Sequence, residues 1–83
     1  MIEHPINEND MARYVRQALG EYFQHLDGEQ PSSELYDMVM NCVEKPLLEM
    51  VLAHAGGKQT RASEILGINR NTLRKKMQQH GIE

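Results

Sequence analysis

The sequence has very few of the features that hold small domains together. Its 83 residues include one cysteine, one phenylalanine and no tryptophan. These numbers exclude a disulfide within the chain and a cysteine-rich zinc site, and they leave few large aromatic side chains for a core. A chain of this length buries only about 60% of its unfolded surface when it folds. We therefore expect a single domain, residues 1–83, that gains stability by self-association.

Long apolar runs and targeting signals are missing as well. No stretch approaches the roughly 20 apolar residues that a membrane span requires, and residues 1–5 lack the basic start and apolar run of a signal peptide. The single cysteine, Cys42, falls among apolar residues at helical spacing, so we expect a buried, reduced thiol. The expected location is the cytoplasm.

Charge is divided unevenly along the chain. The formal net charge is −3, but residues 56–83 carry six Lys or Arg against two Glu, which gives this segment +4. Residues 1–55 carry three basic against ten acidic residues, which gives −7. A cationic segment attached to an acidic body is typical of a protein that contacts a polyanion at one end and repels it elsewhere.

Apolar residues recur at intervals of three and four over the first part of the chain, which indicates helices. One helix is expected at about 10–27, followed by a turn at 27–33. A second helix is expected at about 33–54. Pro46 lies inside it and removes one backbone donor, so we expect a kink at 42–46. The apolar spacing keeps its phase there, which argues against two separate helices.

The second helix is apolar on more than one side, because Leu48 and Leu52 add a second face to its main apolar stripe. Such a helix must be enclosed. This chain has too few elements to enclose it, so we expect a second copy of the chain to cover it. The predicted dimer interface consists of Val15, Leu19, Tyr22, Phe23, Val39, Cys42, Val43, Leu47, Met50 and Val51.

Residues 59–78 fit the physical demands of a helix-turn-helix. A short helix is expected at about 59–66, then a turn at 67–69 and a last helix to about 79. Ala62 and Ser63 are small where two helices must cross closely, and Gly67 permits the positive φ of a tight turn. The expected local core consists of Ile65, Leu66, Ile68, Leu73 and Met77.

The last helix has a cationic outer face in this prediction. With Leu73 and Met77 inside, the outward residues are Asn71, Arg74, Lys75 and Gln78. Asn69 and Arg70, at the start of the helix, lie where a recognition helix presents residues to base edges in the major groove. The alternative is a solvated helical face, which predicts mixed charge signs for i,i+4 pairing. No acid occurs from residue 69 to 81, so we favour DNA contact.

Three of these residues have a second, structural interpretation. Asn69 is a suitable cap for its own helix, and Thr72 is placed to help satisfy the first turn. Arg61 is spaced to pair with Glu64, but an exposed pair gains at most about 1 kcal/mol and leaves the arginine available to phosphate.

Several motifs along the chain are typical of one family. They are Val15-Arg16-Gln17-Ala18-Leu19, Tyr22-Phe23, Leu35-Tyr36, Pro46-Leu47-Leu48, Gln59-Thr60-Arg61-Ala62 and Gly67-Ile68-Asn69-Arg70-Asn71-Thr72-Leu73-Arg74-Lys75-Lys76. On these residues the sequence resembles the Fis family (factor for inversion stimulation) of bacterial nucleoid-associated DNA-binding proteins. The likeness covers nearly all of the chain from Met11 onward.

The resemblance implies an all-α fold of four helices in an intertwined homodimer. Two N-terminal dimerisation helices, the second kinked at Pro46, occupy residues 10–55 after a short arm at 1–9, and the helix-turn-helix region occupies residues 56–83. The two recognition helices would lie closer together than one turn of straight DNA. The implied function is sequence-tolerant DNA binding and bending. A homodimer of this kind regulates transcription and organises the nucleoid, with double-stranded DNA as its partner and RNA polymerase as a further candidate.

The family pattern also assigns roles to residues of the cationic segment. Residues expected at base edges are Asn69, Arg70 and Lys75; those expected at phosphates are Thr60, Arg61, Thr72, Arg74 and Lys76. Lys58 stands where the family commonly has asparagine, and a lysine reaches phosphate but cannot cap the short helix. The region before Met11 is shorter than the family's N-terminal arm, which contacts DNA recombinases in relatives. We therefore expect bending and gene regulation rather than recombinase contact.

Other functional classes agree less well with these residues. Similar helix-turn-helix segments end the NtrC group of activators, but the first two helices and the length favour Fis. A helical protein-interaction module that never meets DNA leaves the cationic last helix unexplained. The four histidines are scattered without i,i+4 pairing and no glycine-rich loop follows a strand, so we expect neither an enzyme nor a metal or other cofactor.

Overall fold

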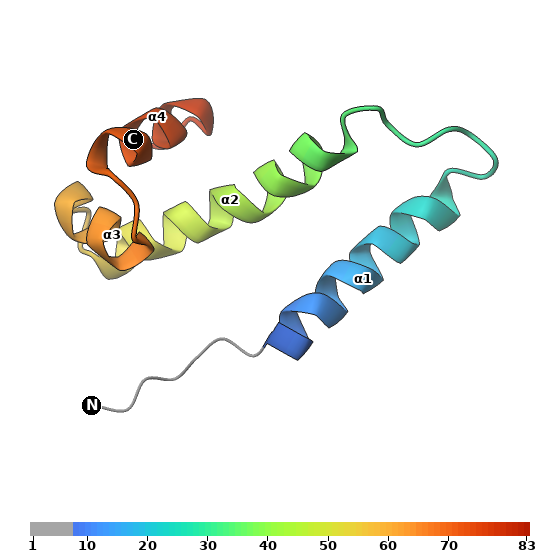
Figure 1. Cartoon of the computed structure of the whole chain (residues 1–83), viewed down its shortest axis with the longest axis horizontal. Coiled ribbons are helices and arrows are strands. Elements are labelled where there is room, and N and C mark those ends of the chain that lie inside the picture. Colours follow the sequence, from blue (N-terminus) through green and yellow to red (C-terminus); the bar gives the residue numbers. More distant parts are fainter. Residues whose placement is uncertain (1–7) are drawn as a thin grey trace. The chain divides into compact units, whose positions relative to one another are not determined.

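The computed structural model describes residues 8–83, and these form four α-helices and no strand (Figure 1). The helices are α1 (Glu8–His25), α2 (Leu35–His54), α3 (Gln59–Leu66) and α4 (Arg70–Gln79). The predicted all-α class is confirmed, and α3 and α4 have the expected bounds. α1 begins and ends two residues earlier than expected and α2 begins two residues later. The expected arm lies outside the described residues, except for its last two, which belong to α1.

The chain divides into two compact units, one up to Ser33 and one from Glu34 to Glu83. The first unit consists of α1 and the turn after it. The backbone N–H of Ser32 donates to the Tyr22 hydroxyl at 3.0 Å, which ties the turn back to the helix, and the Tyr22 and Phe23 rings meet edge to face at 5.4 Å. No second helix covers α1 among the described residues of this unit. Its apolar side chains are therefore exposed or only partly buried, and Phe23 is 49% exposed.

The second unit has a core in which α3 and α4 pack on the C-terminal half of α2 (Figure 1). The buried residues are Leu48, Leu52 and Ala55 from α2, Ala62 from α3, and Leu73 and Met77 from α4. Leu48 and Leu73 are almost fully buried. The chain's own helix-turn-helix therefore covers the second apolar face of α2, which carries Leu48 and Leu52, whereas the cover of its main apolar stripe by a second copy stays a prediction.

The other side of α2 is open in the single chain. Val43, Leu47 and Met50 are 39%, 47% and 73% exposed, and Cys42 is exposed as well. The predicted burial of Cys42 is not found within the chain, because this side of α2 faces away from α3 and α4. The helix continues through Pro46 without a break, as expected. The kink at this residue stays a prediction.

A glycine ends α3 and lets the chain turn into α4. Gly67 has φ 73°, a left-handed conformation, and its N–H donates to the Glu64 carbonyl at 3.2 Å. The Ile68 N–H donates to the Ser63 carbonyl at 3.1 Å. These two bonds form a Schellman motif, which satisfies carbonyls that the helix end leaves open. Ile68 is thereby directed onto the core, where it is partly buried.

Ile65 is not a core residue, contrary to the prediction. It is 40% exposed, whereas its neighbours Ala62 and Ser63 are buried. A helix advances by about 100° per residue, so Ala62, Ser63 and Leu66 share one narrow face of α3. Ile65 falls outside that face.

The turn at Gly67 gives a first testable prediction. A Cβ added at this position meets no atom within 4 Å, so Gly67→Ala changes backbone strain without a steric clash. We expect the alanine variant to lose about 1–2 kcal/mol of unfolding free energy, because the left-handed conformation disfavours a Cβ. Gly67→Asn should lose less, since asparagine tolerates this conformation. Urea unfolding at one protein concentration measures both, and equal losses would contradict a backbone origin.

Candidate nucleic-acid interface

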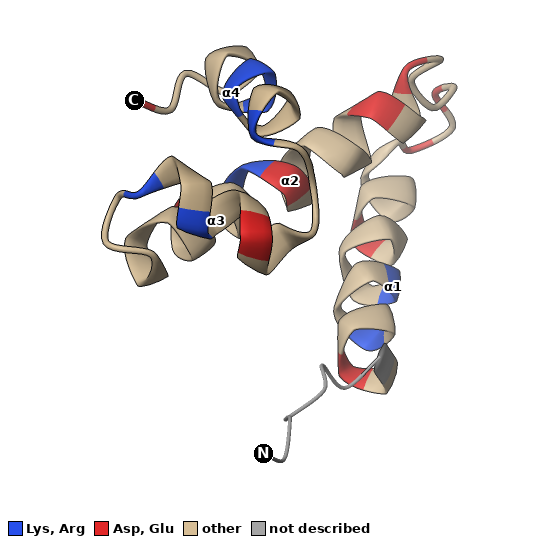
Figure 2. Ribbon diagram, turned by 60° about the vertical axis from the view of Figure 1, so that its left-hand side comes forward, with Lys and Arg blue, Asp and Glu red and all other residues tan. Residues whose placement is uncertain are grey.

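Lys45 lies on α2, and the other cationic residues of the second unit lie on α3, on α4 and in the loop before α3 (Figure 2). Nine of the residues from 58 to 76 were predicted to contact DNA, and eight of them are exposed. The exposed ones are Lys58, Thr60, Arg61, Asn69, Arg70, Thr72, Arg74 and Lys75. Lys76 is the exception. None of the three residues Arg70, Arg74 and Lys75 is enclosed in the apolar core.

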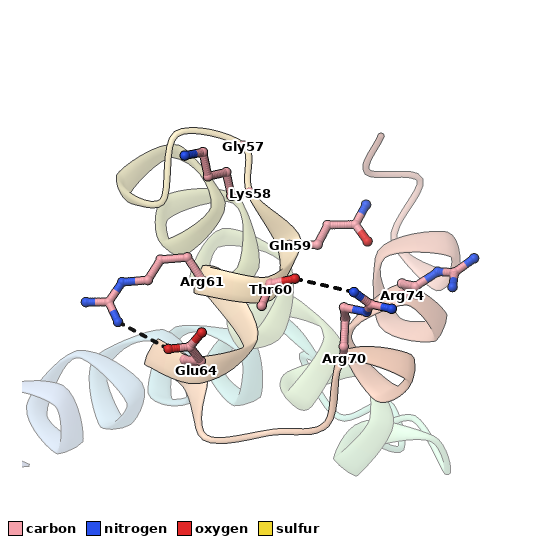
Figure 3. Close-up of a pocket in the computed structure, with 8 residues that line it drawn as sticks. All are labelled: Gly57, Lys58, Gln59, Thr60, Arg61, Glu64, Arg70 and Arg74. Atoms are coloured by element: carbon pink, nitrogen blue, oxygen red, sulfur yellow. Dashed lines mark hydrogen bonds and ion pairs between the residues drawn. The ribbon is translucent and has the colours of Figure 1, made fainter.

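A hollow of about 710 Å³ opens between the start of α3 and α4 (Figure 3). Its lining consists of Gly57, Lys58, Gln59, Thr60, Arg61, Glu64, Arg70 and Arg74. Four of these eight residues are Lys or Arg and one is acidic, so the hollow is positively charged. Both helices of the helix-turn-helix contribute cations to it. A convergent cationic surface of this kind attracts polyanions.

Arg70 is oriented by the neighbouring helix. Its Nη1 donates to the Thr60 hydroxyl over 3.4 Å, and Figure 3 shows the side chain reaching from α4 toward Thr60. A bond of this length is weak. It brings two predicted DNA-contacting residues together and leaves the guanidinium exposed. Arg74 points away from α3 in the same view.

Asn69 caps α4, which confirms one of its two predicted roles. Its side-chain oxygen accepts the Asn71 backbone N–H at 2.7 Å, while its own backbone is extended. The cap uses the oxygen of the side-chain amide. The two N–H donors of the same amide have no partner within the described chain, and they are the groups suited to a base-edge acceptor.

The outer face of α4 carries the polar residues that were expected there. Asn71, Arg74, Lys75 and Gln78 line another, smaller hollow. Their spacing of three and four residues places them on one side of the helix, away from buried Leu73 and Met77. The predicted inward and outward sides of α4 are therefore confirmed.

The remaining predicted residues differ in their surroundings. Lys58 precedes α3 without a side-chain cap bond, as expected for a lysine. Arg61 lies 3.6 Å from Glu64 in an exposed ion pair, which gains at most about 1 kcal/mol. Thr72 is exposed but lines neither hollow.

Lys76 is paired with an acid on α2, and its contact with phosphate stays a prediction. Its Nζ lies 2.8 Å from Oε2 of Glu44, while Oε1 of the same carboxylate lies 2.8 Å from His80 Nε2. No acid occurs near Lys76 along its own helix. Glu44 is 32 residues away, and the available signal was its position one turn before Leu48, on the buried side of α2.

The surroundings of Glu44 stabilise its charged form. The hydrogen bond from Lys76 lowers the pKa of the Glu44 carboxyl below its ordinary value, and the bond from His80 lowers it further. Partial burial acts in the opposite direction but is the smaller influence. The Glu44 side chain is 23% exposed and that of His80 only 7%.

Over residues 8–83, no three His, Cys, Asp or Glu side chains are grouped so that they could hold a metal ion. In the same part of the chain, no helix combines the length and apolar character needed to cross a membrane.

Two crossed helices joined at a left-handed glycine, with the second exposing a cationic face, define a helix-turn-helix protein. The family model described as "Bacterial regulatory protein, Fis family" matches residues 41–80. The chain belongs to the Fis family, because relatives described as Fis or Fis-like proteins are at least 46% identical over most of its length.

Relatives match nearly the whole chain, including α1 and α2, which favours this family over the NtrC group. A "Putative Fis-like DNA-binding protein" of Ralstonia nicotianae is 51% identical over 77 residues, 93% of this chain and 99% of the relative. A protein of the same description from Neisseria meningitidis serogroup A is 52% identical, over 88% of this chain and 91% of the relative. "DNA-binding protein Fis" of Glaesserella parasuis is 46% identical, over 98% of this chain and 76% of the relative.

The lowered pKa of Glu44 gives a second prediction. A carboxyl that is harder to protonate in the folded state contributes stability above the unfolded pKa, near 4.5, and loses it as the pH falls through the lower folded value. Glu44→Gln should therefore lower the unfolding free energy at pH 7, and its difference from wild type should shrink as the pH falls below 4.5. Denaturant unfolding at several pH values measures this difference.

The matched control is Glu49→Gln, which removes the same charge from an exposed position on α2. We expect a small effect from it at pH 7, within about 0.5 kcal/mol. A difference between wild type and Glu44→Gln that stays constant from pH 7 to pH 3 would contradict the stabilising role of the charged carboxylate.

Proposed function

We propose that this chain is a sequence-tolerant DNA-binding and DNA-bending protein, which acts as a homodimeric transcription regulator and nucleoid organiser. The observation that carries the proposal is the exposed face of α4, where Arg70, Arg74 and Lys75 stand on a helix-turn-helix scaffold. The relatives' names, which describe DNA-binding proteins, support it. The protein acts by binding and has no catalytic role in this proposal.

The beginning of α4 is the part that enters the major groove. Arg70 is suited to a bidentate contact with guanine, and Asn69 offers its amide N–H groups beside it. Lys75 follows on the outer face of the same helix. These three residues are the proposed base contacts, and α4 is the recognition helix.

Phosphates are bound on both sides of this helix. The proposed contacts are Lys58, Thr60, Arg61, Thr72 and Arg74. Arg61 is included among the phosphate contacts because its exposed ion pair with Glu64 is weak and readily exchanged for a phosphate. The acidic first part of the chain repels DNA, so the field of the whole chain orients the cationic unit toward the duplex.

A second copy of the chain covers the apolar faces that remain open. On α1 these include Val15 and Phe23, and on α2 they include Val43, Leu47 and Met50, which are 36–73% exposed in the single chain. Apolar surface of this extent is costly in water. The proposed interface is completed by Leu19, Tyr22, Val39, Cys42 and Val51.

Dimerisation explains bending and a loose consensus. A dimer presents two recognition helices, and their spacing imposes a curvature on the DNA that fits both. Part of the specificity then depends on how easily the sequence deforms. A regulator of this kind works on the nucleoid, and RNA polymerase is the further partner that we propose at promoters.

Replacing Arg70 tests the proposed function directly. Arg70→Ala should cost about 1–3 kcal/mol at the base pair that it reads and should remove the preference among duplex sequences. Gel-shift titrations on a panel of short duplexes measure both effects. Arg16→Ala is the matched control, because it removes the same charge from an exposed site on α1 and should leave the preference unchanged.

The salt dependence of wild-type binding separates DNA binding from a protein-interaction role. The logarithm of the affinity should fall with the logarithm of salt concentration by about 0.9 for each phosphate neutralised. A flat response, or an Arg70→Ala variant with the wild-type preference, would contradict the proposal.

A further inference from the structure

A row of polar contacts joins α2 to α4 beside the apolar core of the second unit. The Gln79 amide N–H donates to the Asn41 side-chain oxygen at 3.1 Å. One turn further along α2, Glu44 bonds Lys76 and His80, each at 2.8 Å. The expected dimerisation helix and the expected recognition helix are therefore directly linked by side chains.

Glu44 is the centre of this link, because each of its carboxylate oxygens has a different partner on α4. Lys76 and His80 are four residues apart, so they lie on the same side of α4, one turn from each other. A carboxylate held at two points along a helix restrains both its rotation and its position along its axis. Apolar packing of Leu48 against Leu73 and Met77 is non-directional and gives less restraint of this kind.

The contacts between α2 and α4 also lie on both sides of Pro46. Glu44 and Asn41 precede Pro46, whereas the core residues Leu48 and Leu52 follow it. Proline removes one backbone hydrogen bond from the helix at this place. α4 therefore contacts α2 on both sides of Pro46, with polar bonds before the proline and apolar contacts after it.

Shielding makes these contacts stronger than ordinary surface pairs. The His80 side chain is 7% exposed, Glu44 23% and Lys76 34%. Charge-assisted hydrogen bonds gain strength as water is excluded from them. If Lys76 moved to a phosphate, the partly buried Glu44 carboxylate would lose one of its two partners. That loss carries a desolvation cost.

We propose that Glu44 is a positioning residue for DNA recognition. It sets the angle of α4 against α2 and keeps Lys76 bound to Glu44 rather than to a phosphate. This inference rests on the proposed function, because an angle between recognition helix and dimerisation helix matters only if both act on DNA. In such a dimer, that angle sets the distance between the two recognition helices and thus the curvature of the bound duplex. Glu44 then acts on DNA without touching it.

The sharpest test is the charge-neutral double variant Glu44→Gln/Lys76→Gln, compared with Arg74→Gln. The double variant removes the ion pair without changing the net charge. We expect it to bind DNA about two- to thirtyfold more weakly and to bend circularly permuted fragments less, with the wild-type salt slope. Arg74→Gln, which removes a proposed phosphate contact, should reduce the slope by about 0.9 per protomer.

A slope that falls in the double variant as it does in Arg74→Gln would overturn the proposal, because Lys76 would then be a phosphate contact. Unchanged affinity and bending would overturn it as well, since the bridge would have no role in positioning. Circular dichroism and urea unfolding first establish that each variant is folded. A wild-type protein that fails to bind DNA would instead contradict the proposed function.

The single variant Glu44→Gln distinguishes positioning from competition, and it decides the question if the double variant does not fold. If Glu44 positions α4, its loss weakens DNA binding and reduces the bend. If Glu44 only withholds Lys76 from DNA, its loss tightens binding and steepens the salt slope, which would overturn the proposal. Glu49→Gln controls for the removal of one negative charge from α2 and should retain the wild-type bend.

Discussion

Burial of one face of α2 by the chain's own helix-turn-helix is the constraint on which the rest of the structure depends. Leu48 and Leu52 are enclosed by Ala62, Leu73 and Met77, so α3 and α4 cannot leave α2 without exposing the core of the second unit. The same packing turns the polar side of α4 outward. It also leaves the opposite side of α2 uncovered, because a chain of this size has no further helix in this unit with which to cover it. The cationic face and the open apolar face are thus two consequences of one packing arrangement.

Within that arrangement the cations of α4 have different surroundings although they follow one another in the sequence. Arg74 and Lys75 lie on the outer face, whereas Lys76 is directed back to Glu44 on α2. A helix turns by about 100° per residue, so adjacent positions face different neighbours. The net charge of α4 therefore overstates the number of cations that are available to a polyanion. The positive charge that remains outside is concentrated at the start of α4 and in the hollow beside α3.

Local features were predictable from the sequence, and long-range ones were not. The bounds of α3 and α4 follow from apolar periodicity, a capping asparagine and Gly67, all of which act over a few residues. The cover over Leu48 and the partner of Lys76 depend on which helices meet in space, and Glu44 and Lys76 are 32 residues apart. The apolar character of Ile65 predicts a core position, but its angle on α3 places it outside the buried face. Glu44 was identifiable in part, since it keeps the helical phase of Leu48 and Leu52.

We propose that a second copy of the chain covers the exposed apolar residues of α1 and α2. Sedimentation equilibrium over a wide range of dilution, combined with circular dichroism, tests it most directly. We expect a species of twice the 9.6 kDa chain mass, whose dissociation on dilution is accompanied by loss of helical signal. A monomer of 9.6 kDa that keeps its full helical signal would contradict it.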